Sequence, residues 1–381
     1  MMKGRPKKRK MGTIDYGIFY TVLILVAIGT VMIYSASSYF AMFKQHDSTA
    51  FLKKQLIACA LGAIALFVFM AIDYHKLKRV TGILMVVTVP LLFAVYLFEP
   101  TNGAYRWIKL GPLSFQPSEL AKYVVVLFLA WHLTKKGDGI KDFWHGVIPP
   151  LCVGGLYAGM VLAQKNLSVA ALIMIVTFVL LFVAGGQNKH MFGVVAPTLV
   201  AAALVFALGE EYRRDRMLNF LDPWKDAADK GYQLIQSFYA LGAGGLTGLG
   251  LGQSRQKTIY MPEPHNDFIF SIIGEELGLI GCLVIISLFV FLIWRGVKVA
   301  MEARDTYGSL LAMGITSIIG FQAIINIAVV TGSMPVTGVP LPFISYGGTG
   351  LLINILAVSL INNIYRNRNI KYNSTISQLN L

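Results

Sequence analysis

The chain has 381 residues, of which 56% are hydrophobic and 14% are charged, and its formal net charge is +14. This composition lies outside the range of ordinary soluble domains, so it excludes a soluble globular protein and indicates an integral membrane protein. The basic residues stand between apolar runs, where anionic headgroups and membrane topology account for them. We therefore expect membrane lipids as partners and no nucleic acid.

Apolar runs of membrane-spanning length cover most of the chain, so the sequence predicts one all-α polytopic domain over residues 16–366. Cytoplasmic tails are expected over 1–15, which is basic, and over 367–381. The first apolar run is too long for a cleaved signal peptide and lacks a clear cleavage site, so we expect it to be the first span. Ten transmembrane helices are predicted, with centres near Val26, Ala63, Val89, Val126, Leu156, Val176, Ala201, Ile286, Ser317 and Leu356.

The distribution of Lys and Arg predicts the orientation in the membrane. With the N-terminus in the cytoplasm, the inner segments hold 19 basic residues and the short outer loops hold 6. The positive-inside rule then places both termini in the cytoplasm. Residues 209–264 form a large extracellular loop between helices 7 and 8, and such long loops cross membranes largely regardless of charge. Long loops are usually functional, so we expect the site there.

The stretch PEPHNDFIFSIIGEELG, residues 262–278, places His265, Asp267, Glu275 and Glu276, with Glu263 before them, where the eighth span begins. At that depth such groups face protein or a water-filled cavity, so we expect the first part of this span to be broken or tilted. Asp267 is the main catalytic candidate, because an acid beside a cavity can be a general base, a cation ligand or an acceptor for a substrate hydroxyl. The alternative for Asp267 is a helix N-cap.

Glu275 lies eight positions after Asp267, about 80° around a helix, and could line the same cavity. The alternative is that Glu275 and its neighbour Glu276 satisfy polar groups on neighbouring helices. None of the six histidines stands at a metal-binding spacing.

The loop before the fourth span ends in signals for a helix start. Pro117 suits the first helical position and Glu119 the third, near the positive end of the helix dipole. Glu119 and Lys122 are three residues apart and share one face, either as part of a site or as an ordinary ion pair.

Two further groups of residues are open to more than one interpretation. Arg106, Trp107 and Lys109 combine two cations with an aromatic ring, a set that suits a sugar phosphate and equally an interfacial anchor. Arg216 belongs to an arginine cluster that is typical of a solvated or headgroup-binding face. The glycine-rich stretch LGAGGLTGLGLGQSRQK, residues 241–257, is no P-loop, and it predicts close helix packing or a re-entrant turn.

Three stretches together resemble the shape, elongation, division and sporulation (SEDS) family, whose members include FtsW, RodA and SpoVE. They are, in chain order, AYRWIKLGPLSFQPSELAKY, GYQLIQSFYALGAGGLTGLGLGQSRQKTIYMPEPHNDFIFSIIGEELGLIG and TGVPLPFISYGGTG. The predicted topology, with ten spans and a large outer loop between the seventh and the eighth, is also similar to that of the family. The resemblance covers nearly the whole chain, and its second stretch is closer to the division and sporulation members than to RodA.

The resemblance implies a glycosyltransferase that polymerises lipid II, an undecaprenyl-diphosphate-linked disaccharide pentapeptide, at the outer face of the cytoplasmic membrane. It also implies a partner, a class B penicillin-binding transpeptidase. Asp267 matches the family's essential acid and Trp107 its extracellular tryptophan. Glu119 and Lys122 match the family's required acid and lysine at the start of the fourth span. The resemblance further implies that His265, Asp267, Glu275 and Glu276 edge a cavity where the lipid-borne sugar meets its acceptor.

Under this resemblance, Asp267 is the general base for the 4-hydroxyl of the acceptor sugar, which attacks the donor's anomeric carbon and expels the lipid diphosphate with inversion. Lys122, Arg106 and Arg216, or a divalent cation such as Mg²⁺ or Mn²⁺, would offset the charge of the diphosphate. The segment QKNLS, residues 164–168, departs from the Gln-Pro-Asp-Leu-Gly of many members, so the role of that acid does not transfer to this chain.

Two other functions remain open from the sequence. A transporter that flips lipid II also suits a polytopic bundle with charged residues in a cavity. The chain shows no convincing internal repeat, and its candidate acids cluster on the outer side, which favours surface chemistry. The second alternative is a non-catalytic scaffold for a division or elongation partner.

Overall fold

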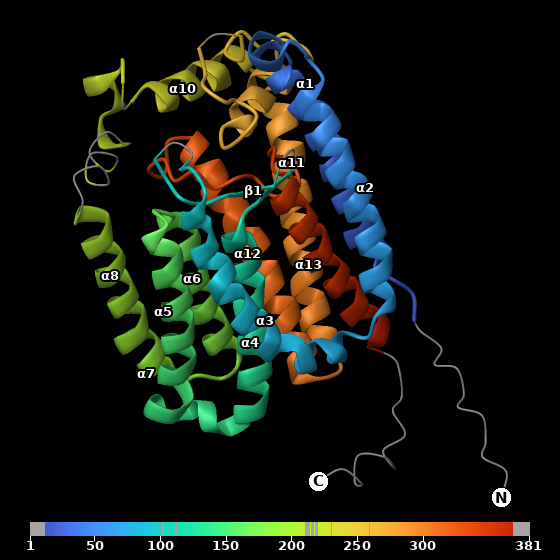
Figure 1. Cartoon of the computed structure of the whole chain (residues 1–381), viewed down its shortest axis with the longest axis vertical. Helices are drawn as coiled ribbons and strands as arrows, with labels where there is room; N and C mark the ends of the chain where they lie inside the picture. Colours follow the sequence, from blue (N-terminus) through green and yellow to red (C-terminus); the bar gives the residue numbers. More distant parts are fainter. Residues whose placement is uncertain are drawn as a thin grey trace, which may run out of the picture.

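The computed structural model describes residues 12–100, 103–110, 113–209, 214, 217, 220–229, 231–258 and 260–368. It is a bundle of long helices with shorter elements at both ends, α10 (Tyr232–Gly244) at one and α7 (Asn188–His190) at the other (Figure 1). The long helices are α1 (Tyr16–Gln45), α2 (Ala50–Ala71), α3 (Leu77–Ala94), α4 (Pro117–Lys136), α5 (Ile148–Ala163), α6 (Leu167–Val183), α8 (Ala196–Leu208), α11 (Ile269–Glu302), α12 (Thr306–Val330) and α13 (Gly348–Asn367). The other shorter helical elements are η1 (Tyr74–Lys76), η2 (Val95–Leu97), η3 (Gly137–Lys141), η4 (Phe143–Val147), η5 (Met191–Val195) and η6 (Pro223–Asp226).

The described helices account for the predicted spans. Each of the ten predicted centres falls inside a helix. Eight helical segments are long and apolar enough to cross a membrane, which makes the chain a multi-pass membrane protein. The two centres outside those eight segments lie in α6, which is apolar but short, and in α4, which carries buried charges. The count of ten spans therefore goes beyond what length and composition support.

The expectation of an all-α structure is corrected at one place. Strands β1 (Ile108–Leu110) and β2 (Leu113–Phe115) pair antiparallel between α3 and α4, with Ile108 opposite Phe115. The hydroxyl of Thr349, at the start of α13, donates to the carbonyl of Ser114 at 2.6 Å. The hairpin is thus fastened to the N-terminus of another helix, a tertiary contact that local sequence patterns do not report.

Only residues 164–166 separate the fifth and sixth apolar runs, which predicts a tight antiparallel pair, and the structure confirms it. Helix α5 ends at Ala163, α6 begins at Leu167, and the two pack against each other. The turn between them needs a left-handed residue, and Lys165 adopts a φ of +58° there. The side chain of Asn166 then caps the first turn of α6.

The predicted break in the eighth span is also confirmed. It lies at Gly278 in α11, whose φ of +67° is not helical. A break leaves backbone groups without helical partners, which is costly inside a membrane. The glycine-rich stretch supplies those partners through four hydrogen bonds, from the N–H of Leu249 to the carbonyl of Glu275, Gly250 to Glu276, Leu279 to Gly245 and Ile280 to Leu246.

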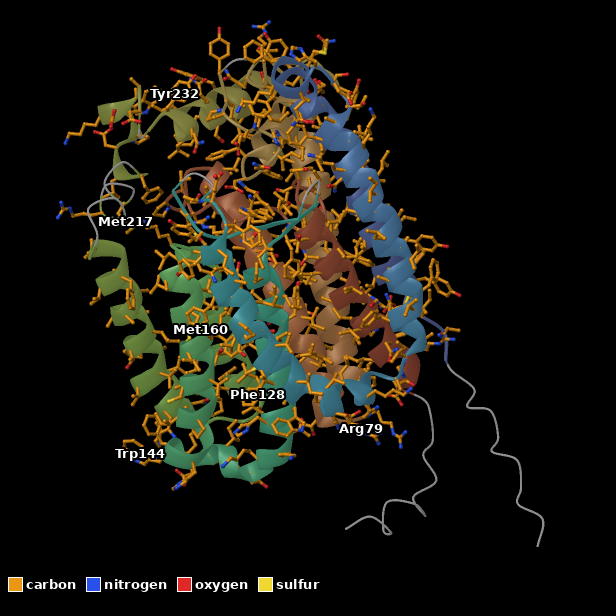
Figure 2. All side chains as sticks on the ribbon, in the orientation of Figure 1. Arg79, Phe128, Trp144, Met160, Met217 and Tyr232 are labelled. Carbon is orange, nitrogen blue, oxygen red and sulfur yellow. The ribbon has the colours of Figure 1, made fainter. Side chains whose placement is uncertain are left out.

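The two ends of the bundle differ in character. The N–H of Gly12 donates to the carbonyl of Arg366, and the Arg366 guanidinium donates to the carbonyl of Gly12, so the two ends of the described chain meet. The hairpin and α10 lie at the opposite end of the molecule (Figure 1). Figure 2 shows the same division, with Arg79 and Trp144 at one end and Tyr232 at the other.

Candidate active site

Asp267 stands two residues before the first residue of α11. The N-cap of this helix is Phe268. The Asp267 side chain is half-buried, and a Cβ atom added at Gly338 would lie 3.2 Å from its Oδ2 atom. The N-cap position thus belongs to Phe268, and the Asp267 carboxylate faces the loop that precedes α13.

The main chain around Asp267 is fixed on that same loop. The carbonyls of residues 265, 266 and 267 accept hydrogen bonds from the Tyr346 N–H at 2.9 Å, the Ser345 hydroxyl at 2.8 Å and the Asn326 amide at 2.7 Å, in that order. Three successive carbonyls are thus held by α12 and by the loop of residues 331–347. This arrangement leaves the backbone beneath the carboxylate little freedom to move.

Glu119 and Lys122 form a buried ion pair in the first turns of α4. The Lys122 ammonium donates to the two carboxylate oxygens at 2.9 and 3.0 Å, and the side chains are 4% and 0% exposed. Helix α4 begins at Pro117, as predicted. A Cβ atom at Gly350 would lie 3.6 Å from Glu119 Oε2, so the pair faces the first turn of α13.

The divergent QKNLS turn lies between these two parts of the site. The Ser168 hydroxyl donates to the carbonyl of Thr337, next to the loop residue that contacts Asp267. On its other side, the Asn166 amide donates to the hydroxyl of Ser118 at 3.4 Å, next to Glu119. The turn therefore connects the α4 start with the loop of residues 331–347.

Four helix N-termini meet in this region, those of α4, α6, α11 and α13. The hydrogen bonds described above link the residues at their starts to one another. The dipole of a helix places about half a positive charge at its N-terminus. Together the four N-termini make this end of the bundle favourable for anionic oxygen atoms.

The predicted cations and the tryptophan before α4 lie on the hairpin side of the site. The Arg106 guanidinium donates to the carbonyl of Lys165, which joins this loop to the QKNLS turn. Trp107 is half-buried, and Lys109 is exposed on β1 opposite Ser114. Arg216 lies outside the described residues.

His265 is buried in an aromatic cluster. Its ring centroid lies 4.4 Å from that of Phe51 and 5.6 Å from those of Phe40 and Tyr346. Burial lowers the pKa of His265 to about 4, so the ring is neutral at pH 7. A neutral, enclosed imidazole is suited to packing rather than to holding an anion.

Glu275 is completely buried and holds the glycine-rich stretch. Its carboxylate accepts hydrogen bonds from the Ser254 hydroxyl and from the N–H groups of Arg255, at 2.9 Å, and Gln256, at 3.4 Å. The side chain thus faces the loop that precedes α11, in keeping with the interpretation of the paired acids as partners of neighbouring polar groups.

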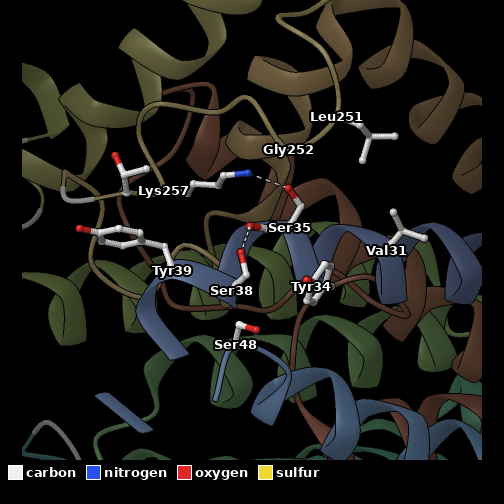
Figure 3. Close-up of a pocket in the computed structure, with 10 residues that line it drawn as sticks. Val31, Tyr34, Ser35, Ser38, Tyr39, Ser48, Leu251, Gly252 and Lys257 are labelled. Carbon is white, nitrogen blue, oxygen red and sulfur yellow. Dashed lines mark hydrogen bonds between the residues drawn. The ribbon is translucent and has the colours of Figure 1, made fainter. Parts of the chain in front are cut away.

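Glu276 binds a lysine that the sequence did not single out. The Lys257 ammonium donates to the Glu276 carboxylate at 2.7 Å and to the Ser35 hydroxyl at 2.9 Å, and all three side chains are buried. Above this network lies a pocket of about 500 Å³ between α1 and the glycine-rich stretch (Figure 3). Its lining residues are Val31, Tyr34, Ser35, Ser38, Tyr39, Ser48, Leu251, Gly252, Lys257 and Thr258.

Asn326 is the residue of this region that sequence reasoning missed. It is buried in α12, and its amide donates to the carbonyls of Asp267 and Val339. An amide inside an otherwise apolar span was the available signal, since such groups are rare in membrane helices and need partners. Within the described ranges, no group of three or more His, Cys, Asp or Glu side chains is placed to hold a metal ion.

Comparison with known proteins agrees with this geometry. The FtsW, RodA and SpoVE family of cell cycle proteins matches residues 16–370. A probable peptidoglycan glycosyltransferase FtsW of Geobacter sp. strain M18 is 41% identical over 93% of this chain and 98% of its own length. Stage V sporulation protein E of Bacillus subtilis is 42% identical over 92% of this chain and 97% of its own length.

Solved structures share the fold. A chain described under "Structural coordination of polymerization and crosslinking by a peptidoglycan synthase complex" superposes with a TM-score of 0.78 and 29% identity, covering 94% of this chain and 99% of its own. The rod shape determining protein RodA of Thermus thermophilus gives a TM-score of 0.70 and 26% identity over the same shares. The fold is therefore RodA-like, and the chain belongs to the FtsW, RodA and SpoVE family.

Proposed function

We propose that the chain is a peptidoglycan glycosyltransferase that polymerises lipid II at the outer face of the cytoplasmic membrane. The position of Asp267 carries the proposal: hydrogen bonds hold its main chain to α12 and its neighbours to the loop of residues 331–347, and its carboxylate lies beside Gly338 of that loop. The helix N-termini of this region favour anionic oxygens, and the reaction releases a lipid diphosphate. The FtsW relative described as a probable peptidoglycan glycosyltransferase supports the same activity.

In the proposed reaction, Asp267 takes the proton from the 4-hydroxyl of the acceptor N-acetylglucosamine. The hydroxyl oxygen attacks the anomeric carbon of the donor N-acetylmuramic acid, and the bond to the lipid diphosphate breaks with inversion. The diphosphate leaves with the electron pair. General-base assistance of this kind is worth roughly 100-fold to 10,000-fold in rate.

The remaining candidate residues divide into two groups. We propose that Lys122, oriented by Glu119, offsets the developing charge on the diphosphate. Arg106, Trp107, Lys109 and Arg216 are proposed to contact the substrate from the loops. His265 and Glu275 are proposed to support the site, because the partners described above already enclose their polar groups.

The proposed topology has ten spans, with α4 and α6 completing the eight longer segments. Helix α4 fits this count because its charged pair is satisfied internally. Both termini are proposed to be cytoplasmic, and the meeting of Gly12 with Arg366 supports their lying on one side. The transmembrane domain is then 16–366, with the extracellular loop at 209–264 and tails at 1–15 and 367–381.

We further propose a class B penicillin-binding transpeptidase as the partner. Similarity to a chain of a peptidoglycan synthase complex that coordinates polymerization and crosslinking supports this assignment. Similarity to FtsW and to a stage V sporulation protein favours a role in division or sporulation over elongation.

The first test is glycan polymerisation from labelled lipid II by the purified protein with its transpeptidase, comparing wild type with Asp267→Asn. We expect polymer from wild type and a loss of at least about 100-fold in the variant, because the amide cannot accept the proton. Melting temperature and co-purification of the partner serve as controls for folding.

Each other outcome points to a different function. Polymer from both proteins would remove the general-base role of Asp267. Polymer from neither, together with lipid II movement across vesicle membranes, would favour a flippase. Polymer from neither, with partner binding intact and no lipid movement, would favour a scaffold.

A further inference from the structure

Asn326 is a buried amide in the middle of a membrane bundle. Its side chain belongs to α12 and is 1% exposed. Burying an amide away from water costs free energy unless hydrogen bonds replace those to water. The Asn326 Nδ2 atom makes two such bonds, each 2.7 Å long, to the carbonyls of Asp267 and Val339.

The two carbonyls belong to segments far apart in the sequence. Asp267 belongs to the segment between α10 and α11, near its end, whereas Val339 lies in the loop between α12 and α13. One amide group therefore fastens both segments to the same point of α12. Asn326 acts directly on the candidate catalytic residue, because its hydrogen bond is to the main-chain carbonyl of Asp267.

The loop of residues 331–347, which contains Val339, also lies against the Asp267 carboxylate. Gly338, the residue before Val339, has a φ of +70°, and a Cβ atom there would lie 3.2 Å from Asp267 Oδ2. The distance between this loop and the Asp267 backbone thus sets the space left for the carboxylate. Asn326 fixes that distance, because its amide is hydrogen-bonded to both the Asp267 carbonyl and the Val339 carbonyl.

We propose that Asn326 is a positioning residue of the transferase, which holds Asp267 and the loop of residues 331–347 in the arrangement needed for proton abstraction. The inference rests on the proposed function. It assigns Asn326 no contact with substrate, so its effect is on turnover rather than on substrate binding.

The test compares Asn326→Leu and Asn326→Asp with wild type in lipid II polymerisation. Leucine keeps the approximate volume and removes both donors, and aspartate keeps the shape but presents acceptor atoms to the two carbonyls. We expect kcat to fall about 10-fold to 100-fold, since misplacement of a catalytic group by about 1 Å can cost that much. The KM for lipid II should stay within about twofold of the wild-type value.

Thr316→Val is the matched control. Thr316 is buried in the same helix, but its hydroxyl donates to the carbonyl of Ala312 within α12. Its replacement also removes a buried polar group without releasing the Asp267 segment. We expect kcat within about twofold of wild type.

Hydrogen exchange provides a readout that does not depend on activity. In Asn326→Leu, amide exchange should rise at least about tenfold in residues 260–268 and 336–341, and should stay unchanged in the first turns of α4. If the Asn326 variants do not fold, Ser345→Ala replaces them. It removes the donor to the carbonyl of Asn266 and the acceptor of the Leu341 N–H, and the same exchange pattern and kcat loss are expected.

Several results would overturn the assignment. Wild-type kcat in Asn326→Leu, a rise in KM alone, or an equal loss in Thr316→Val would each contradict it. A wild-type protein without polymerase activity would contradict the proposed function. Unchanged exchange around Asp267 in Asn326→Leu would contradict the positioning role by itself.

Discussion

At the scale of single residues, three ionisable groups within residues 262–278 have distinct environments. Asp267 is half-buried against a glycine, whereas Glu275 is saturated by donors of the glycine-rich stretch. His265 lies among aromatic rings. The three groups are close in sequence, so their different surroundings follow from which helix or loop each one meets.

The environment of His265 predicts a dependence of stability on pH. Its pKa is about 4 in the folded protein and about 6.5 when unfolded. As pH falls from 6.5 to 4, the unfolded chain takes up the proton and the folded chain does not, so stability is lost across this window, by about 3 kcal/mol in all. Above pH 6.5 this contribution is fully present.

His265→Phe should remove that dependence, because phenylalanine keeps a ring in the cluster and does not titrate. The measurement is the melting temperature of the two proteins in detergent between pH 4 and 7.5. Parallel curves for variant and wild type would show that His265 is not the group responsible.

At the scale of elements, the break in α11 and the glycine-rich stretch depend on each other. The left-handed residue at the break is Gly278, and a Cβ atom there would lie 2.4 Å from the backbone nitrogen of Gly248. The close approach allows the hydrogen bonds that replace the interrupted helix ladder.

Gly278→Ala should therefore destabilise the protein. A left-handed non-glycine residue costs about 1–3 kcal/mol, and the clash with Gly248 adds to it. We expect a lower melting temperature and reduced polymerisation. Gly159→Ala in α5 is the control, since a Cβ atom there meets nothing within 4 Å. An equal effect of the two substitutions would show that the close approach is not needed.

At the scale of the whole molecule, the positions of the loops define the proposed orientation. The segment before α11, the hairpin and the QKNLS turn lie at one end of the bundle. The two ends of the described chain meet at the other end of the bundle. The proposed activity needs the first of these ends to face outward, where lipid II is polymerised.

Thiol labelling in intact cells tests this orientation. In a background without the three native cysteines, Trp224→Cys should react with a membrane-impermeant reagent, because the residue is exposed within η6, which lies in the proposed extracellular loop. Lys141→Cys, exposed between α4 and α5, should react only after permeabilisation. The reverse pattern would exclude the proposed topology.

The sequence by itself determined the membrane class, the centres of the helices and the main catalytic candidate. Hydrophobic runs report partition into the bilayer, and this depends only on local composition. The helix start at Pro117 and the tight turn before Leu167 also follow from local sequence. A proline favours the first position of a helix, and a connection of three residues forces two helices to lie antiparallel.

Only the tertiary structure decided which polar groups meet. A helix in lipid is apolar on nearly all faces, so periodicity does not reveal which side contacts a neighbour. The bond from Asn326 to Asp267 joins residues 59 positions apart, and that from Lys257 to Ser35 joins residues 222 apart. Such pairs arise from how the helices pack, because a bilayer offers buried polar groups no partner except the protein itself.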